Sequence, residues 1–270
     1  MQLTSFEDID ISHRHIFLSP HFDDAVYSCG GTLGVQVSVG LRPLVITIFG
    51  GAPDQTTSLS PFATDVHRKM GFSQDIATAI QTRRQEDSAA MEHLGVDYLW
   101  LAYPDAIYRG NPPYYSEHSQ LIGGAVDSGD RWIDEELAEI LISLRERLPD
   151  AVWYAPLAIG RHVDHQIVCS AADRLIRLGA RVNLYEDFPY VARNPNALVE
   201  RLEEFGNLLE PGLVEMSEML PRRLTAAAKY SSQTGVNFAD EANMFKEMKS
   251  YSHNIRPVET VHLERYWNVR

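Results

Sequence analysis

The sequence has little cysteine and no long apolar run. Its two cysteines, Cys29 and Cys169, are too few for the disulfide framework of a small secreted protein. We expect both to be buried in helices as small apolar side chains. No apolar run approaches the roughly 18 residues of a membrane-spanning helix, and residues 1–15 lack the apolar segment of a signal peptide. These absences favour a cytoplasmic protein without a membrane span.

Positive charge is also scarce. The chain has 24 Lys and Arg residues against 37 Asp and Glu residues, which gives a net charge of -13. Nucleic acids and anionic membranes need a basic surface, so neither is expected as the main partner. An acidic surface also keeps a protein soluble, so the charge does not identify a substrate. The oligomeric state is left open by the sequence.

Short, apolar, β-branched segments alternate with amphipathic segments along the chain. This order predicts an α/β fold, a Rossmann-like three-layer α/β/α sandwich with a mostly parallel central sheet. We expect one domain over residues 1–270, in which residues 206–270 pack on the core or cover the cleft. The expected strands are 15–20, 41–50, 97–103, 151–158 and 181–188, and the expected helices are 24–40, 76–95, 132–148 and 164–179.

Two long segments, 50–75 and 103–131, show no clear periodicity and are rich in Gly, Pro, Tyr, Ser and Asn. Each follows an expected strand, so both should overhang the carboxyl edge of the sheet. Open α/β sheets bind their ligands at that edge. The second segment carries Asp105 and several tyrosines, which suit the hydroxyls and the apolar face of a sugar.

A histidine and two aspartates stand where the first expected strand ends, in "SPHFDD". His21 and Asp24 are three residues apart around a turn, so their side chains can converge on one point, while Asp23 must point elsewhere. Adjacent carboxylates repel each other unless a cation is near. Taken alone, the stretch also fits a turn in which an aspartate caps the following helix.

A second cluster, "HVDH", follows the strand expected at 151–158 and again begins a helix. It contains His162, Asp164 and His165. Because parallel strands end at the same edge, the two clusters can meet there. Two histidines and one carboxylate with an open position are the ligands of hydrolytic zinc, and the same set also suits non-haem iron(II). Together the clusters favour a metal site.

These motifs resemble a known family. "SPHFDD" is similar to the PHPDD signature of the PIG-L/LmbE-like zinc-dependent N-acetylglucosamine deacetylases, and "HVDH" is similar to their HPDH motif. The helix "TRRQEDSAAMEHLG" resembles another element of the family. The segments "YEDFPY" and "KYSSQ" look like elements of the branch that deacetylates sugar moieties on metabolites. The resemblance covers most of residues 15–235.

The resemblance implies a role for each matching residue. His21, Asp24 and His165 would be the zinc ligands, with Fe²⁺ or another divalent ion as the alternative metal. Asp23 would be the general base that activates a water molecule. Two further catalytic residues follow from the second motif: His162 would stabilise the oxyanion or protonate the departing amine, and Asp164 would orient or tune His162.

Three further residues are candidates for substrate binding. Arg83 matches the motif arginine, although it could equally be a helix-surface residue paired with Glu86 one turn on. Asp105 belongs to the segment over the expected cleft. Arg161, next to the second motif, either assists the oxyanion or lies on the surface. Glu186 and Asp187 in "YED" stand near the same edge of the sheet, where Asp187 could approach the site; the favoured interpretation is a capping or solvated pair.

The resemblance implies a zinc-dependent hydrolase that deacetylates an N-acetylglucosamine-type amino sugar, free or conjugated. Two alternatives stay open. The enzyme could hydrolyse a longer N-acyl chain or a non-sugar amide, which a long apolar groove from 50–75 and 103–131 would favour. The second alternative is a homologue that binds metal or sugar without catalysis, although the intact Asp23 and His162 argue against it.

Overall fold

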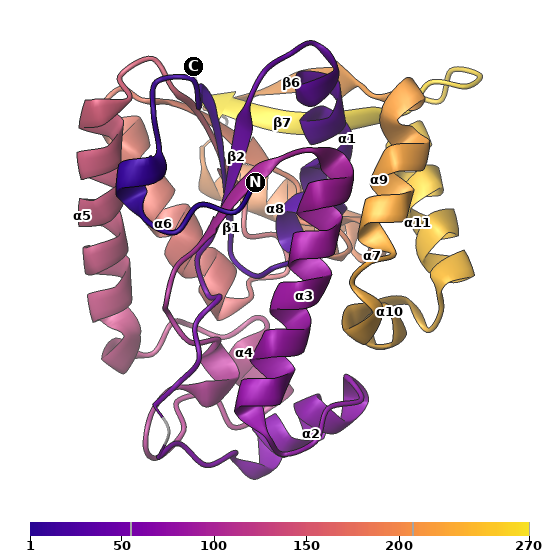
Figure 1. The fold of residues 1–270 in the computed structure, drawn as a ribbon. Helices are drawn as coiled ribbons and strands as arrows, with labels where there is room; N and C mark the ends of the chain where they lie inside the picture. Colours follow the sequence, from indigo (N-terminus) through magenta and orange to yellow (C-terminus); the bar gives the residue numbers. More distant parts are fainter. Residues whose placement is uncertain (55, 207, 270) are drawn as a thin grey trace.

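A computed structural model describes residues 1–54, 56–206 and 208–269, and in this part of the chain one sheet of seven strands forms the centre (Figure 1). The strand order is β3-β2-β1-β4-β5-β7-β6. The strands are β1 (His15–Ser19), β2 (Pro43–Thr47), β3 (Asp97–Trp100), β4 (Val152–Pro156), β5 (Arg181–Tyr185), β6 (Leu209–Glu215) and β7 (Leu263–Val269).

The first five strands are parallel, and β7 and β6 continue the sheet in antiparallel pairing. In register, His15 of β1 lies opposite Pro43 of β2 and Val152 of β4. The α/β fold with a mostly parallel sheet is therefore confirmed. β6 was not predicted, because Pro211 and Gly212 interrupt its sequence and six of its seven residues lie at least partly exposed.

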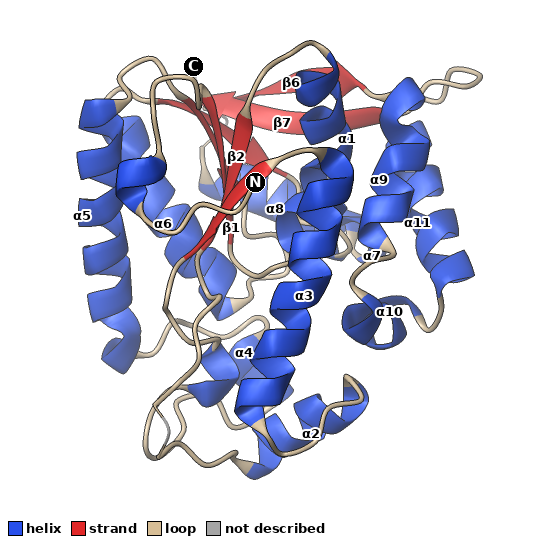
Figure 2. Cartoon of the chain, in the orientation of Figure 1, coloured by secondary structure: helices blue, strands red, loops and turns tan. Residues whose placement is uncertain are grey.

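Both faces of the sheet are covered at its central strands, which explains the apolar runs in β1 and β2. Successive side chains of β1 point to opposite faces. Ile16 and Leu18 pack with α5 (Arg131–Arg147) and α6 (Val163–Arg177), whereas Phe17 packs on the other side. That other side is covered by α1 (Asp24–Ser38), α3 (Ile76–Leu94), α9 (Leu220–Ala227) and α11 (Glu241–Asn254) (Figure 2).

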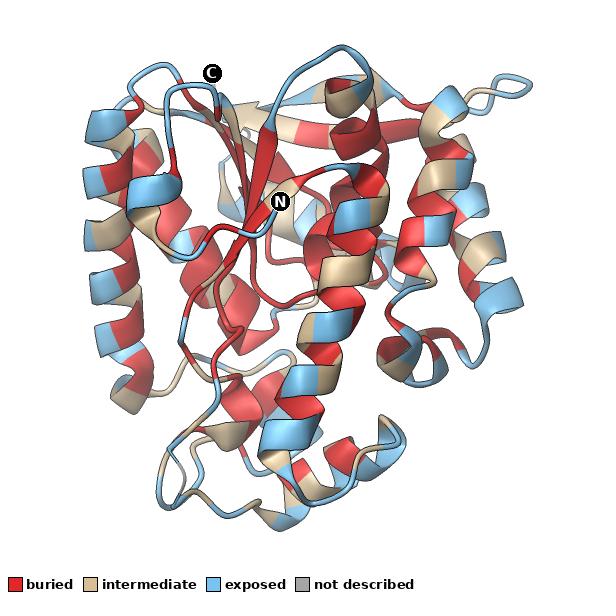
Figure 3. Cartoon of the chain, viewed as in Figure 1, coloured by how far each residue is buried: buried red, intermediate tan, exposed pale blue. Residues whose placement is uncertain are grey.

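The four predicted helices α1, α3, α5 and α6 are present, with ends within two residues of expectation. In α3, α5 and α6 the inward faces are buried and the outward faces are at least partly exposed, whereas α1 is buried over most of its length (Figure 3). Gly95 ends α3 in the left-handed region, with φ 71°, as its position predicted. Cys29 and Cys169 are buried in helices, also as expected. Within the described residues, no helix combines the length and apolar character needed to cross a bilayer.

The two long segments lie beyond the carboxyl ends of the parallel strands (Figure 1). The first contains a helix that the sequence did not reveal, α2 (Pro61–Lys69). It begins with Pro61 at its first turn, and the Ser60 hydroxyl oxygen accepts a hydrogen bond from the Ala63 amide. The second contains α4 (His118–Leu121) and two short 3₁₀ turns.

The C-terminal segment contributes to both the sheet and the cleft. Its strands β6 and β7 complete the sheet, and α9 packs against α1. Its helix α10 (Ser231–Phe238) reaches the cleft described below. Between β5 and β6 lie α7 (Tyr190–Arg193) and α8 (Pro195–Glu204). Because the strands of the whole described chain share one sheet, we infer a single domain.

A buried carboxylate attaches this segment to the first helix. Glu264 of β7 accepts hydrogen bonds from the backbone amides of Gly31 and Thr32 and from the Thr32 hydroxyl, at 2.8, 2.7 and 2.6 Å. It also lies 3.4 Å from the buried Arg223 guanidinium of α9. The helix can approach this closely only because residue 31 is glycine, since a Cβ there would lie 2.6 Å from Met216.

We predict that Glu264→Ala lowers the free energy of unfolding by about 3 kcal/mol, because it leaves the Arg223 charge and two backbone amides buried without a partner. Urea denaturation followed by circular dichroism measures this. The control is Glu135→Ala on the exposed face of α5, which should change stability by less than about 0.5 kcal/mol. Equal effects of the two substitutions would contradict the prediction.

Candidate active site

A cleft of about 710 Å³ opens at the carboxyl ends of β1 and β4. Its floor holds His21, Asp23 and Asp24 from the turn between β1 and α1, together with His162 at the start of α6. The two motifs of the sequence therefore meet at one edge of the sheet, as predicted. The walls come from α2, residues 105–122, residues 188–193 and residues 233–237.

Three side-chain atoms converge on the floor. Asp24 Oδ2 lies 3.2 Å from His21 Nδ1 and 3.2 Å from His165 Nε2. All three residues are buried, and their ligand atoms lie within 4.8 Å of one another. His21, Asp24 and His165 are the residues that the sequence singled out as metal ligands.

Each histidine of this group is held from behind by a second carboxylate. His165 Nδ1 lies 2.6 Å from Asp187 Oδ1, and His21 Nε2 lies 2.9 Å from Asp164 Oδ2. The outer nitrogen of each ring thus donates its proton outward, and the inner nitrogen points at Asp24. Such carboxylate–histidine pairs orient the imidazoles of metal sites.

The inner nitrogen of His165 is the observation that most directly favours a cation between these three residues. Within the described residues His165 Nε2 is buried and has no hydrogen-bond partner, although it faces a carboxylate oxygen. With the ring proton on Nδ1, a lone pair faces an acceptor, which is repulsive unless a cation lies between them. These three residues therefore fit a divalent metal ion.

Protons are the alternative cations for this group. Burial opposes the charged form of His165, but Asp24 and Asp187 outweigh it and raise the pKa of His165 to about 9. Burial likewise opposes ionisation of His21, yet Asp105, Asp164 and Asp24 hold its pKa well above the usual value. Metal and protons therefore compete for the same nitrogens.

A second set of potential ligands, His21, His162 and Asp164, overlaps the first. Two of its members, His162 and Asp164, form other hydrogen bonds. His162 Nδ1 accepts a hydrogen bond of 3.2 Å from the Asp164 amide, and Asp164 Oδ1 accepts one of 2.6 Å from Arg109. The geometry therefore favours His21, Asp24 and His165 over this second set.

Asp23 occupies the N-cap position of α1, but its carboxylate serves the cleft. Its side chain makes no capping hydrogen bond at the start of α1; instead Asp23 Oδ1 lies 3.3 Å from Arg83 Nη2 in the cleft. Burial and the neighbouring Asp24 raise the pKa of Asp23 to about 6, against the opposing effect of Arg83 and His21. A carboxyl group of this kind, facing a cleft, can accept and return a proton near neutral pH.

Arg83 is buried, with 7% of its surface exposed, so the surface interpretation of this residue is wrong. Its guanidinium bridges Asp23 and Asp105 at 3.3 and 3.4 Å. The proposed surface partner, Glu86, instead bonds to Ser231 and Ser232 at the start of α10. Arg83 and Asp105 both line the cleft, where they can contact a substrate.

The ring of His162 is almost perpendicular to the ring of His21, and the two ring centroids lie 4.8 Å apart. Burial and the charge of His21 hold the pKa of His162 well below its usual value. The ring is therefore neutral, and because Nδ1 accepts the Asp164 amide, its proton resides on Nε2. His162 can donate a hydrogen bond into the cleft.

Two predicted residues have other surroundings than expected. The Asp164 carboxylate bonds to His21, Arg109 and the Ala106 amide, and its link to His162 runs through the backbone instead. Arg161 has positive φ (56°), and its guanidinium pairs with Glu204 of α8 on the surface. The structure does not bring Arg161 into the cleft.

Two contributions to the site differ from the favoured sequence interpretation. Glu186 and Asp187 are buried, so the capping or solvated interpretation is wrong, and Asp187 contacts His165. Sequence reasoning also missed the contact of Arg109 with Asp164, because no sequence pattern points to it. The wall formed by α10 belongs to residues 206–270, for which the sequence left open packing on the core or covering the cleft.

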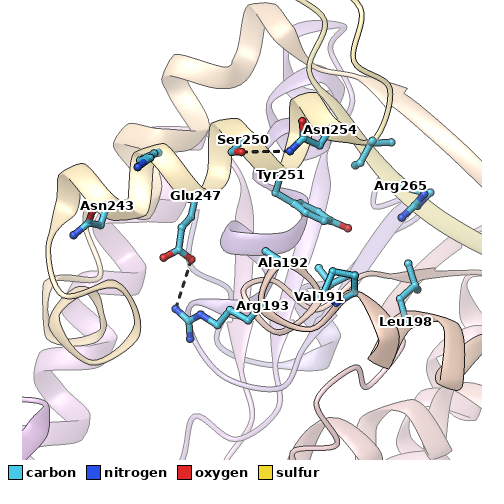
Figure 4. A pocket seen from close by; sticks show the side chains of 13 residues that line it. Val191, Ala192, Arg193, Leu198, Asn243, Glu247, Ser250, Tyr251, Asn254 and Arg265 are labelled. Atoms are coloured by element: carbon cyan, nitrogen blue, oxygen red, sulfur yellow. Dashed lines mark hydrogen bonds and ion pairs between the residues drawn. The ribbon is translucent and has the colours of Figure 1, made fainter.

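A separate cavity of about 540 Å³ lies on the far side of α7, between α7 and α11 (Figure 4). Val191 and Ala192 line this cavity, and Tyr190 of the same helix lines the cleft. Arg193 borders both and lies 3.7 Å from Glu247. The cavity contains none of the clustered histidines and aspartates, so the chemistry belongs to the cleft.

Several known proteins are similar to this chain in sequence and in fold. A 2'-N-acetylparomamine deacetylase of Niallia circulans is 32% identical over 237 residues, 84% of this chain and 83% of that protein. Another of Streptomyces fradiae is 30% identical over 232 residues, 82% of this chain and 74% of that protein. A crystal structure of a deacetylase in teicoplanin biosynthesis superposes with a TM-score of 0.77 at 27% identity, covering 95% of this chain and 98% of that chain.

A structure described as the zinc-inhibited form of a teicoplanin deacetylase is similar to the same extent, with a TM-score of 0.77 and 26% identity over 95% of this chain and 98% of that chain. The family model for PIG-L, described as GlcNAc-PI de-N-acetylase, matches residues 16–176, which include every histidine and aspartate of the floor. The chain belongs to the PIG-L (GlcNAc-PI de-N-acetylase) family and is an N-deacetylase.

Proposed function

We propose that this enzyme uses a divalent metal to remove the acetyl group from an N-acetylated amino sugar within a glycoconjugate. The observation that carries the proposal is the convergence of His21 Nδ1, Asp24 Oδ2 and His165 Nε2 beside Asp23 in an open cleft. We propose zinc as the resident metal, with Fe²⁺ as the alternative that the same ligands allow.

His21, Asp24 and His165 would hold the metal. A bound divalent ion supplies a Lewis acid that polarises the acyl carbonyl and lowers the pKa of water. Asp23 takes the proton of the attacking water and returns it to the nitrogen when the C–N bond breaks. His162, with its proton on Nε2, donates a hydrogen bond to the oxygen that becomes negative.

Arg83 and Asp105 would bind hydroxyl groups of the sugar, because both are charged, buried and at the cleft surface. The relatives named for 2'-N-acetylparomamine make that compound the first substrate to test. The carboxylates of the cleft and the net charge of -13 suit a substrate that carries ammonium groups.

A longer N-acyl group is the second candidate, because apolar side chains line one wall. Phe62 and Val66 of α2 and Leu121 and Ile122 near α4 face the cleft. They could hold an acyl chain, or equally an apolar part of the conjugate.

We expect Asp23→Asn to retain one equivalent of metal and to lower kcat by about 10²–10⁴-fold, because the proton acceptor is lost while the metal ligands stay. Amine release from 2'-N-acetylparomamine and elemental analysis measure the two quantities. The control Asp65→Asn, an exposed carboxylate of α2, should leave both unchanged. Normal turnover by Asp23→Asn would refute the role of Asp23, and no turnover by the wild type on any N-acyl sugar would refute the proposed function.

Asp187→Asn should weaken metal binding by about 10–100-fold, because the amide cannot accept from both His165 and the Ile159 amide as the carboxylate does. Competition with a chromophoric chelator gives the affinity for zinc. The matched control is Glu186→Gln, a buried neighbour that faces Arg265 and Trp267. An equal loss in both variants would mean that the effect is on folding and not on the metal.

A series of N-acyl glucosamines from acetyl to octanoyl separates the two candidate substrates. We expect kcat/KM to fall as the chain lengthens, and Val66→Ala to leave the acetyl substrate unaffected. A maximum at a long chain that Val66→Ala abolishes would instead establish a longer N-acyl group as the substrate. Titration with zinc beyond one equivalent is included, since a relative has been described in a zinc-inhibited form.

A further inference from the structure

Arg109 is a buried cation next to the proposed metal site but outside the cleft. Its guanidinium lies 2.6 Å from Asp164 Oδ1 and 3.0 Å from Asp130 Oδ2, and it donates to the Pro104 carbonyl at 3.2 Å. Only 5% of its surface is exposed. It borders a neighbouring cavity formed by residues 52–54, 56–61 and 102–132, so an effect of Arg109 on the reaction has to pass through another residue.

Asp164 connects Arg109 to a proposed metal ligand. One oxygen, Oδ1, accepts from the guanidinium. The other, Oδ2, accepts from His21 Nε2 at 2.9 Å and from the Ala106 amide at 3.1 Å. Asp164 is fully buried, so without the guanidinium its charge would lose its nearest cation and one oxygen would lose its partner.

We propose that Arg109 is a positioning residue that keeps Asp164 turned toward His21 and thereby fixes the His21 ring for metal binding. With Oδ1 held by the guanidinium, Oδ2 faces His21 and receives its Nε2 proton. The lone pair of Nδ1 then points toward Asp24 and His165. The proposal rests on the metal site of the proposed function.

The shape of arginine is needed here. A planar guanidinium can donate to Asp164, Asp130 and the Pro104 carbonyl at the same time, and a single ammonium cannot reproduce that fork. The guanidinium also lies over the rings of Phe49 and Tyr115, at 4.9 and 5.7 Å from their centroids. Arg109 therefore ties the segment 103–131, which carries Asp105 of the cleft, to the metal ligand.

The test compares Arg109→Met with Arg109→Lys and with the control Asp130→Asn. Asp130 shares the same guanidinium but does not touch His21. Two quantities are measured on the full chain: zinc affinity by chelator competition, and the low-field NMR signal of the His21 Nε2 proton in the metal-free protein, identified by its loss in His21→Asn. The visible spectrum of the Co²⁺-substituted protein reports ligand geometry.

We expect Arg109→Met to weaken zinc binding by about 10–100-fold, to remove the low-field signal and to change the Co²⁺ spectrum. Arg109→Lys should keep part of the zinc affinity, of the low-field signal and of the wild-type Co²⁺ spectrum. Asp130→Asn should leave all three unchanged. If Arg109→Met does not fold, the double variant Arg109→Met/Asp130→Asn, in which only one buried carboxylate remains without its partner, takes its place with the same expectation.

A folded Arg109→Met or double variant with wild-type zinc affinity and an intact His21 signal would overturn the proposal. Loss of zinc affinity that is equal in Asp130→Asn would overturn it too, because the effect would then come from the loop and not from Asp164. Failure of the wild type to bind zinc or Co²⁺ would refute the metal site instead, while the low-field signal in the metal-free protein still decides whether Arg109 positions His21.

Discussion

The compensation of buried negative charge is the constraint on which this site depends. Asp23, Asp24, Asp105, Asp164 and Asp187 are all buried around the carboxyl ends of β1, β4 and β5. Carboxylates packed this closely need cations between them. Two arginines, Arg83 and Arg109, neutralise the periphery, and His21 and His165 face the centre. At the centre, a proton or a metal ion has to compensate the remaining negative charge. A metal ion at this position can take part in hydrolysis.

The helix α3 links this charge balance to the shape of the cleft. Arg83 on its inner face reaches Asp23 and Asp105, and one turn further Glu86 holds Ser231 and Ser232. The cleft wall formed by α10 is therefore fixed by the same helix that contacts Asp23, the proposed general base. A segment near the end of the chain becomes part of the cleft in this way, although the family model matches only residues 16–176.

The sequence allowed the central fold and the convergence of His21, Asp24 and His165 to be predicted, but not all the partners of these residues. Apolar runs identified the five parallel strands, and glycine or a 3.6-residue period marked the helices between them. The partners of the histidines were mistaken: Asp164 was assigned to His162, two residues away, whereas its carboxylate bonds to His21, 143 residues distant. The favoured interpretation of Asp187 was a solvated or capping residue, with an approach to the site as the alternative, and the structure shows that it contacts His165. Hydrogen bonds between elements far apart in sequence have no local pattern.

By itself the sequence determined which residue types stand at the ends of β1 and β4, because strands are recognised from their local pattern. The rule that parallel strands end at one edge of a sheet then predicted that these residues lie near one another. Tertiary structure alone decided what each side chain faces. It buried Arg83, turned Arg161 to the surface beside Glu204, and placed Arg109 behind Asp164. The reason is physical: the side to which a charged side chain turns depends on the opposite charges that packing brings near it, and these come from other parts of the chain.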